Sequence, residues 1–300
     1  MELKHLRTFV CAIEQTSFTR AAAVLHITQA AVSQHVAALE KELQTELFHR
    51  QGRSVQLTES GQRLREYARR ILDLADEAVC KVGGSDRQVC RTLCIAASTV
   101  PAEWILPDLL ARFHAEFPDV RESLIVSDSK SAAGAVDSGS ADVGFIGELP
   151  ASSELEARPI AADQLLLVVS PQHAWAAKSS ISVNQLSAEP LIIREQDSGS
   201  RHCLELALEQ HGVRLSDLTV ALEVNSNDAI RAAVASRVGV AFLSANSVAR
   251  DLADGNLATT RVRGLKLHRQ LYLITRRSGP PSEPLRQFLS LILSWTHNQR

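Results

Sequence analysis

Two short amphipathic patterns follow each other closely near the start of the chain, in SFTRAAAVLHITQAAVSQHVAALEKEL at residues 17–43. Ser17 and Thr28 precede them, and both residue types cap helix N-termini well. Apolar residues then recur at three- and four-residue steps, as on the buried face of a helix: Phe18, Ala21, Ala22 and Leu25 in the first pattern, Val32, Val36, Leu39 and Leu43 in the second. The stretch predicts a helix-turn-helix, with a support helix before it over residues 3–13.

The next segment, LFHRQGRSVQLTESG at residues 47–61, favours a hairpin. Residues 47–48 and 55–57 are short apolar runs, and the Gly-containing turn between them is flanked by Arg50 and Arg53. A hairpin beside a helix-turn-helix is a wing, whose arginines would lie against phosphates or in the minor groove. The pattern therefore predicts a winged helix-turn-helix over residues 1–58.

The outward side of the second helix of this motif carries Gln29, Ser33, Gln34 and His35. Amides hydrogen-bond adenine edges in the major groove, and a serine hydroxyl can form a hydrogen bond with several different bases. On an isolated helix such residues would simply be solvated, but the adjoining turn and wing favour binding of double-stranded DNA. Bulk charge does not decide the matter: the net charge is −2, and residues 1–66 carry eight Lys and Arg against seven Asp and Glu.

A long helix follows over residues 59–82, with a single apolar stripe on a charged background. The stripe consists of Leu64, Tyr67, Ile71, Leu74, Ala75, Ala78 and Val82. Such a stripe needs a partner, which is either the rest of its own domain or the same helix of a second chain. We expect the second, because no globular segment surrounds the helix in sequence. The stretch GGSDRQ at residues 83–88 then predicts a hinge, so residues 59–87 form a linker and dimerisation segment.

Beyond the hinge, short apolar runs such as TLCIAAS, QLLLVVS and GVAFLS alternate with helical stretches. This alternation indicates an α/β fold with mainly parallel sheets, and about 210 residues suit two subdomains. No run of apolar residues is long enough to span a membrane and the N-terminus is polar, so we expect a cytoplasmic protein with no membrane partner. The five cysteines fit reduced thiols better than disulfides.

Sequence motifs give no support for catalysis. The motifs G-x-S-x-G, G-x-G-x-x-G, P-loop and H-E-x-x-H are absent, and the ten histidines show no ligand spacing. We therefore expect no enzyme activity, no metal and no cofactor. Two alternatives stay open: a solute-binding protein fused to a helical module, against which the missing export signal argues, and an enzyme built on the α/β half, which would need a catalytic constellation.

Two loops in the α/β half carry the elements of an anion site. Ser98 and Thr99 follow one apolar strand, and Ser198, Ser200 and Arg201 follow another, each directly before a helix. Backbone N–H groups, hydroxyls and a guanidinium at such positions bind anions. The alternative is ordinary helix capping. Because both loops end strands of a parallel sheet, we expect them to face one ligand cleft.

The chain resembles the LysR-type transcriptional regulators. The residues that carry this resemblance are the N-terminal block MELKHLRTFVCAIEQTSFTRAAAVLHITQAAVSQHVAALEKELQTELFHRQGRSVQLTESG and the order of elements after it. The resemblance implies a periplasmic-binding-protein-like effector domain over residues 88–300, built of two Rossmann-like subdomains. Subdomain I would cover about residues 88–162 and 268–300, and subdomain II about residues 163–267.

The same resemblance implies partners and site residues. The partners would be DNA, a small effector, further copies of the chain as a homodimer or homotetramer, and RNA polymerase. The implied DNA-binding residues are Thr28, Gln29, Ala30, Ser33, Gln34, His35, Arg50 and Arg53, and the implied effector-binding residues are Ser98, Thr99, Ser129, Ile146, Ser198, Ser200 and Arg201. Ala30 and Gln34 depart from the proline and arginine of many members, which leaves base preference open. The SGSR loop is similar to that of the subgroup that regulates carbon-fixation and sulfur-assimilation genes, which favours an anionic effector.

Overall fold

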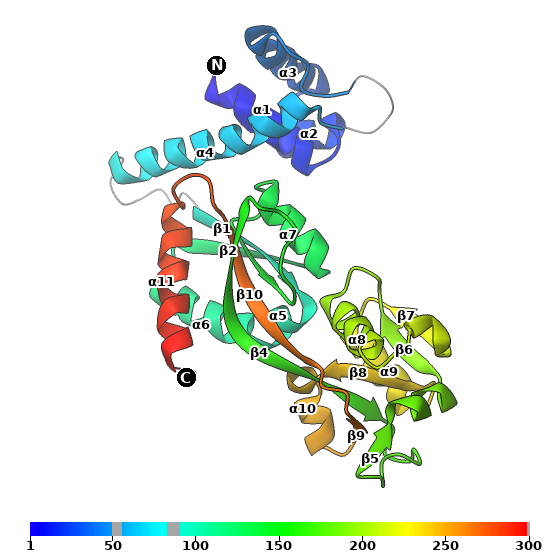
Figure 1. Cartoon of the computed structure of the whole chain (residues 1–300). Helices are drawn as coiled ribbons and strands as arrows, with labels where there is room; N and C mark the ends of the chain where they lie inside the picture. The colour runs from blue at the N-terminus through cyan, green and yellow to red at the C-terminus, as the bar shows by residue number, and fades with distance from the viewer. Residues whose placement is uncertain (50–55, 83–90, 299–300) are drawn as a thin grey trace. The chain divides into compact units, whose positions relative to one another are not determined.

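A computed structural model describes residues 1–49, 56–82 and 91–298 (Figure 1). The chain divides into two compact units, Met1–Cys90 and Arg91–Arg300. The predictions for Arg50, Arg53 and the hinge at residues 83–88 lie outside the described residues.

The N-terminal unit contains the predicted helix-turn-helix. Its helices are α1 (Leu3–Glu14), α2 (Phe18–Val24), α3 (Gln29–Leu43) and α4 (Glu59–Val82). The hydroxyl of Ser17 accepts a hydrogen bond from the backbone N–H of Arg20 (3.3 Å), and the hydroxyl of Thr28 accepts one from Ala31 (3.1 Å). Both predicted N-caps are confirmed, and they fix where α2 and α3 begin.

Aromatic packing ties the entry of the wing to the helices. The ring of Phe48 lies 5.4 Å from that of Phe9 and 5.3 Å from that of Phe18. Phe48 also forms an antiparallel bridge with Leu57, which is the part of the predicted hairpin that the described residues contain. Gly61 of α4 passes so close to this strand that a Cβ would lie 2.1 Å from the carbonyl oxygen of Leu47. Only glycine fits at this crossing.

The apolar stripe of α4 is divided between two environments, contrary to the expectation of one intermolecular seam. Leu64 of the stripe is buried in the core of the unit, and Ile71 packs against that core; Leu72, outside the predicted stripe, is also buried there. Leu74, by contrast, is 66% exposed. A salt bridge of 2.6 Å between Arg69 and Glu14 also joins α4 to α1. The sequence did not reveal this division because α1 lies far from α4 along the chain.

The C-terminal unit is a mixed sheet with helices on both faces. Its strands are β1 (Arg91–Ser98), β2 (Val120–Ser127), β3 (Val143–Ile146), β4 (Leu155–Val169), β5 (Ser180–Ser182), β6 (Leu191–Arg194), β7 (Val220–Val224), β8 (Val240–Ser244), β9 (Ala258–Arg263) and β10 (His268–Arg276). The strand order is β2-β1-β3-β10-β4-β8-β6-β7, and β9 pairs with both β4 and β5. The pairs β1–β2, β1–β3, β6–β7 and β6–β8 are parallel, as expected for this fold class.

Helices cover both faces of this sheet, as in Rossmann-like folds. The helices are α5 (Thr99–Trp104), α6 (Leu106–Glu116), α7 (Ser129–Asp137), α8 (Gly199–Glu209), α9 (Asn227–Ala235), α10 (Ala245–Ala253) and α11 (Glu283–Asn298), with short 3-10 helices η1 (Val183–Ala188) and η2 (Leu215–Asp217). At the β1–β3 end, α6 and α11 share a core with one face of the sheet and α7 with the other. At the β6–β8 end, α8 packs on one face, and α9 and α10 pack on the other.

Two long antiparallel strands, β4 and β10, join these two ends (Figure 1). Residues 155–164 of β4 pair with β10, whereas residues 165–169 pair with β8 and β9. A buried ion pair lies where β4 changes from pairing with β10 to pairing with β8 and β9. Arg269 donates to Oδ2 of Asp163 at 2.8 and 2.9 Å, and Ser244 donates to Oδ1 of Asp163 at 2.6 Å. The side chain of Asp163 is fully buried. These three residues fix how the strands cross.

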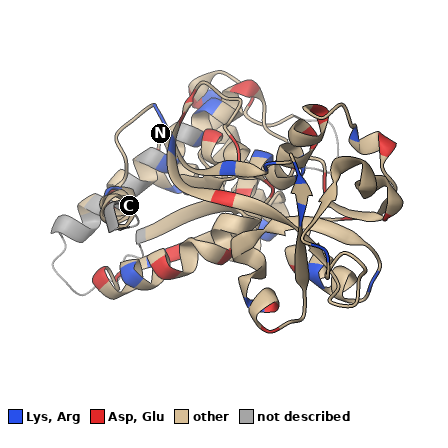
Figure 2. Ribbon diagram, turned by 60° about the horizontal axis from the view of Figure 1, so that its bottom comes forward, with Lys and Arg blue, Asp and Glu red and all other residues tan. Residues whose placement is uncertain are grey.

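Charged side chains are distributed over the whole of the described structure. Figure 2 shows acidic and basic residues interspersed along the helices and strands, in line with the net charge of −2. Among the residues described, none of the helices combines the length and apolar character that a bilayer crossing requires.

Candidate functional site

The outward face of α3 presents polar side chains without internal partners. Gln29, Ala30 and Gln34 are exposed and Ser33 is half-buried. In the part of the chain that the structure describes, the side chains of Gln29, Ser33 and Gln34 take part in no hydrogen bond or ion pair. They are therefore available to groups outside the protein. The hydroxyl of Thr28, which caps the helix, already accepts one hydrogen bond.

His35 differs from the expectation that it faces outward with these residues. Its Nδ1 lies 2.8 Å from the hydroxyl of Thr8, which itself donates to the carbonyl of Lys4. Because that hydroxyl proton is already used, Nδ1 of His35 must be the donor. Burial and the nearby charge of His5 lower the pKa of His35, so the ring is neutral near pH 7. His35 thus fixes α3 against α1 through Thr8, and we do not retain it as a DNA-binding candidate.

In the C-terminal unit, the two predicted loops meet at one polar cleft. Five of the predicted residues line it: Ser98, Thr99, Ser129, Ser198 and Ser200. Ser98 and Thr99 stand where β1 ends and α5 begins, and Ser129 is the first residue of α7, after β2. Ser198 and Ser200 stand at the start of α8, after β6. The free volume is about 10 Å³, which is room for one water molecule. A larger ligand requires the cleft to open.

The serine residues of this cleft are buried, and most of their hydroxyls have no partner in the part of the protein that the structure describes. Ser98, Ser198 and Ser200 are only 9%, 4% and 8% exposed. Ser98 and Ser198 occupy N-cap positions, yet neither side chain accepts a cap hydrogen bond. Within the described residues, the hydroxyl of Ser200 has no partner either. Helix capping therefore does not account for these serines. Their hydroxyls are not among the buried unpartnered atoms of the described residues, so they reach the cleft, where a ligand or water can bond to them.

Two arginines that the sequence analysis missed also line the cleft, Arg194 and Arg269. Arg194 is the last residue of the apolar strand β6, and only 5% of it is exposed. In the sequence, the signal for Arg194 was a charged residue at the end of an apolar run. Arg269 stands in a polar stretch of β10 and gave no such signal. Its guanidinium lies over Gly147, where a Cβ would approach Nη1 to 2.8 Å.

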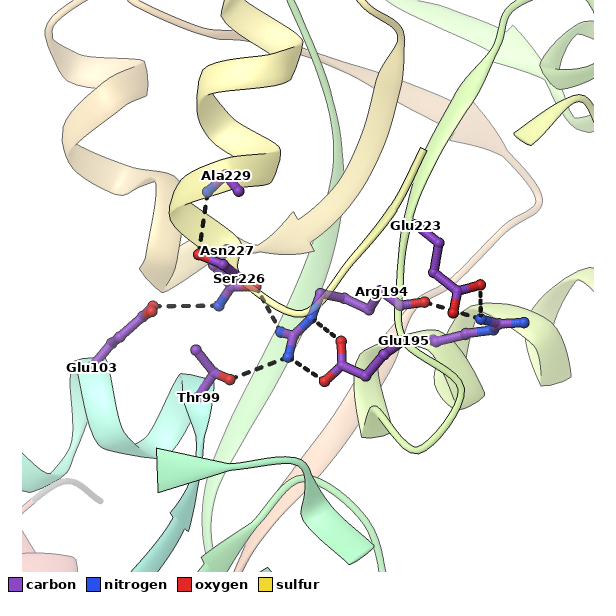
Figure 3. A network of polar contacts seen from close by, with 9 residues as sticks. Thr99, Glu103, Arg194, Glu195, Glu223, Ser226, Asn227 and Ala229 are labelled. Carbon is purple, nitrogen blue, oxygen red and sulfur yellow. Dashed lines mark hydrogen bonds and ion pairs between the residues drawn. The ribbon is translucent and has the colours of Figure 1, made fainter. Parts of the chain in front are cut away.

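Figure 3 shows that Arg194 connects elements from both ends of the sheet. Its guanidinium donates to both carboxylate oxygens of Glu195 (2.7 and 2.8 Å), to Oδ1 of Asn227 (2.8 Å) and to the hydroxyl of Thr99 (3.2 Å). Asn227 in turn donates to the carboxylate of Glu103 at 3.3 Å. Thr99 and Glu103 belong to α5, whereas Arg194 and Asn227 belong to β6 and α9. These contacts cross the cleft and hold it closed.

Two predicted effector residues are not placed in the cleft. The guanidinium of Arg201 donates to Glu205, to Glu223 and to the backbone carbonyl of Arg194. Its partners lie on α8, β7 and the backbone of Arg194, and Arg201 itself is not among the lining residues. Ile146 is fully buried in the core between the sheet and α7. Alternation along β3 directs this side chain to α7, so neither residue is kept as a candidate.

Two acidic residues near the cleft, Asp128 and Asp197, have partners. Asp197 pairs with Lys130 of α7 at 3.2 Å. Asp128 accepts hydrogen bonds from the N–H and the hydroxyl of Ser131; burial acts to raise its pKa, but these bonds leave the pKa lowered. Burial raises the pKa of Glu148. Asp128 and Asp197 are therefore paired, whereas the carboxyl of Glu148 has no hydrogen-bond or ion-pair partner among the described residues.

A larger cavity, of about 520 Å³, lies between α11 and β4. Trp104, Leu289, Ile292 and Trp295 are among its lining residues, and its surface is mainly apolar. Arg158, which also lines it, pairs with Glu156 at 2.9 Å. The described residues bring no convergent set of polar groups to this cavity, so we assign the candidate effector site to the smaller polar cleft.

Comparison with known families decides the identity of the fold. Residues 3–62 match the bacterial regulatory helix-turn-helix proteins of the lysR family, and residues 86–296 match the LysR substrate binding domain. The chain belongs to the LysR family of transcriptional regulators. The N-terminal unit is therefore the DNA-binding part of a LysR-type regulator and the C-terminal unit is its effector-binding part. The matched families and the relatives' names describe regulators and not enzymes.

Curated relatives of this LysR-type regulator agree with the expected subgroup. A probable RuBisCO transcriptional regulator of Cyanidium caldarium is 32% identical over 97% of this chain and 93% of its own length. The regulator CysL of Bacillus subtilis is 30% identical over 90% of this chain and 89% of its own length. The predicted resemblance to regulators of the carbon-fixation and sulfur subgroup is confirmed.

Solved LysR-type structures share the fold. A full-length variant of OxyR from Pseudomonas aeruginosa has a TM-score of 0.73, at 22% identity over 99% of this chain and 95% of its own. CbnR in complex with its target DNA has a TM-score of 0.63, at 24% identity over 98% and 99%. The regulatory domain of Synechocystis CcmR in complex with 2-PG has a TM-score of 0.63, at 26% identity over 69% and 98%. The predicted fold class is confirmed.

Proposed function

We propose that this LysR-type regulator reads DNA with α3 and the wing, and that a small anion bound in the polar cleft changes its action at a promoter. The proposal that a small anion binds is supported by the composition of the cleft. Three serine hydroxyls without partners in the described structure, on buried residues, and two arginines line the same space. Hydroxyls and guanidinium groups together bind carboxylate and phosphate oxygens well.

The nature of the anion is supported by a related regulator. CcmR, which is 26% identical to this chain, holds 2-phosphoglycolate in its regulatory domain. This compound carries a phosphate and a carboxylate, either of which suits the arginines of the cleft. We therefore take 2-phosphoglycolate and inorganic phosphate as first probes. Domain limits of 1–58, 59–87 and 88–300 and a cytoplasmic location complete the proposal.

Assembly into dimers and then tetramers fits the exposed apolar residues. On α4, Leu74 is 66% exposed, which suits pairing with α4 of a second copy. At the two outer edges of the sheet, Ile125 and Val126 of β2 are 51% and 52% exposed, and Val220 of β7 is 40% exposed. Apolar edge strands tend to be covered by another chain. Two separate sets of contacts could build a homotetramer, with RNA polymerase as a further partner at promoters.

DNA recognition by α3 gives the first prediction. The double variant Ser33→Ala/Gln34→Ala should keep its fold, because neither side chain has a partner within the described residues. It should lose preference for its operator over unrelated DNA, by roughly 1–3 kcal/mol for each lost base contact. Fluorescence anisotropy on operator and scrambled duplexes measures the ratio. The control Ser179→Ala/Gln270→Ala alters exposed residues of the effector unit and should bind as wild type. Equal discrimination by all three proteins would remove α3 from the interface.

The effector cleft gives the second prediction. Thr99→Val removes a hydroxyl that contacts Arg194, and Ser200→Ala removes one that has no partner among the residues described. Each should weaken binding of 2-phosphoglycolate by about 0.5–1.5 kcal/mol and leave operator binding unchanged. Calorimetry measures the first effect and anisotropy the second. Ser216→Ala, an exposed change outside the cleft, is the control. If both cleft variants bind the probe as tightly as the control does, the effector site lies elsewhere.

A further inference from the structure

Three positive groups around the cleft each carry an internal carboxylate partner. Arg269 pairs with Asp163, Arg194 with Glu195, and Lys130 with Asp197. An incoming anion must therefore share a cation with a carboxylate or displace that carboxylate. The three pairs differ in how easily this can happen.

Asp163 is the least replaceable of the three. Its side chain is fully buried and also accepts a hydrogen bond from Ser244 at 2.6 Å. The Lys130–Asp197 pair lies at the other extreme, since its side chains are 75% and 50% exposed. Water already solvates both members, so neither contributes a strong buried charge.

The pair of Arg194 and Glu195 combines a buried cation with a more accessible anion. The side chain of Arg194 is 5% exposed, whereas that of Glu195 is 24% exposed. Within the described residues, the carboxylate of Glu195 has no partner other than Arg194. It can turn into water without breaking a second interaction. The guanidinium stays in place, because Asn227 and Thr99 also accept from it.

The main chain at this point is also held independently of Glu195. The guanidinium of Arg201 donates to the carbonyl oxygen of Arg194 at 3.1 Å and to Glu223 at 2.8 Å. Movement of the Glu195 side chain therefore need not displace β6. This gives Arg201 a positioning role in place of the direct contact predicted from the sequence.

We propose that Glu195 is a built-in counter-ion that the effector's anionic group displaces from Arg194. This inference rests on the proposed effector cleft and deepens it: Arg194 is the charge-recognising residue, and Glu195 sets the selectivity. The carboxylate or phosphate of the effector takes the place of the Glu195 carboxylate, so the buried guanidinium of Arg194 keeps a negative partner throughout. A neutral ligand cannot make this exchange, since it would leave the guanidinium uncompensated. The site therefore rejects neutral polar molecules of the same size.

Calorimetry of the full chain with inorganic phosphate and with 2-phosphoglycolate tests the exchange. In Glu195→Gln the competing charge is gone, and affinity for both probes should rise by about 10- to 100-fold, the range expected for charge-assisted hydrogen bonds. Glu209→Gln removes the same charge from an exposed position of α8 and should change affinity less than about twofold. Adding Arg194→Lys to Glu195→Gln should abolish the gain, because lysine cannot form the two parallel hydrogen bonds.

Two outcomes would overturn the exchange. In the first, Glu195→Gln binds the probes no more tightly than Glu209→Gln does. In the second, the gain in affinity survives the addition of Arg194→Lys. If Glu195→Gln does not fold, Glu195→Asp replaces it: the shorter carboxylate cannot reach both nitrogens, and a smaller gain is expected, so unchanged affinity there also refutes the idea. A different result would show that the serine cleft is not the effector site. A gain that persists unchanged in Thr99→Val and Ser200→Ala backgrounds would keep the exchange at Arg194 but remove the serine cleft as the effector site.

Discussion

Asp163→Asn is expected to lower the free energy of unfolding of the effector unit by about 3–5 kcal/mol. The substitution keeps the size of the side chain but leaves the guanidinium of Arg269 without its counter-charge. The Arg269 side chain is 8% exposed and that of Asp163 is fully buried, so solvent cannot compensate. The same change weakens the acceptor for Ser244. Urea denaturation followed by circular dichroism measures the loss, and the midpoint of thermal unfolding should fall by roughly 10 °C.

A matched control separates this effect from the loss of a charge as such. Asp254 faces Arg250 at 3.7 Å, with side chains 54% and 95% exposed. Asp254→Asn should change stability by less than about 0.5 kcal/mol, as is usual for an exposed pair. If both variants are equally stable, the crossing of β4 and β10 does not depend on the buried ion pair.

Leu74→Asp is expected to dissociate the dimer and to lower affinity for a two-half-site operator by about 100-fold or more. The charge would enter the proposed seam between two α4 helices, where it has no obvious partner. Leu74 is 66% exposed in the single chain, so the change should not disturb its own domain. Ile71, in contrast, packs against the core of its own unit, and a charge there would confuse unfolding with dissociation.

Sedimentation velocity and anisotropy on one-half-site and two-half-site duplexes give the readouts. Binding to a single half-site should be little affected, since α3 is untouched. Gln62→Asp places the same charge at an exposed position near the start of α4 and should leave the assembly intact. An unchanged oligomer in Leu74→Asp would mean that α4 does not form the seam.

The regular elements could be predicted from sequence because each has its own local signal. Ser17 and Thr28 cap their helices where the periodic patterns begin. Alternating apolar runs and helical stretches likewise predicted the α/β class. The division of the α4 stripe could not be predicted, because it depends on packing against α1.

Only those residues of the effector cleft that directly follow a strand could be predicted from the sequence. Ser98 and Ser198 follow apolar strands, and the ends of parallel strands meet at one edge. Arg194 and Arg269 were missed because their roles depend on contacts across long sequence separations, with Thr99 and Asp163. His35 and Arg201 were misplaced for the same reason: each finds a partner, Thr8 or Glu223, that its local sequence does not indicate.

Selection of binding sequences from randomised duplex DNA tests whether α3 reads a specific operator, because it works without a known operator or effector. The full chain should enrich a sequence with two related half-sites in twofold symmetry, separated by about one helical turn or a multiple of it. The Ser33→Ala/Gln34→Ala variant, carried through the same rounds, should enrich weakly or not at all. If the wild-type chain enriches no common sequence, it does not bind DNA sequence-specifically. If the variant recovers the same sequence with equal efficiency, α3 does not read the bases.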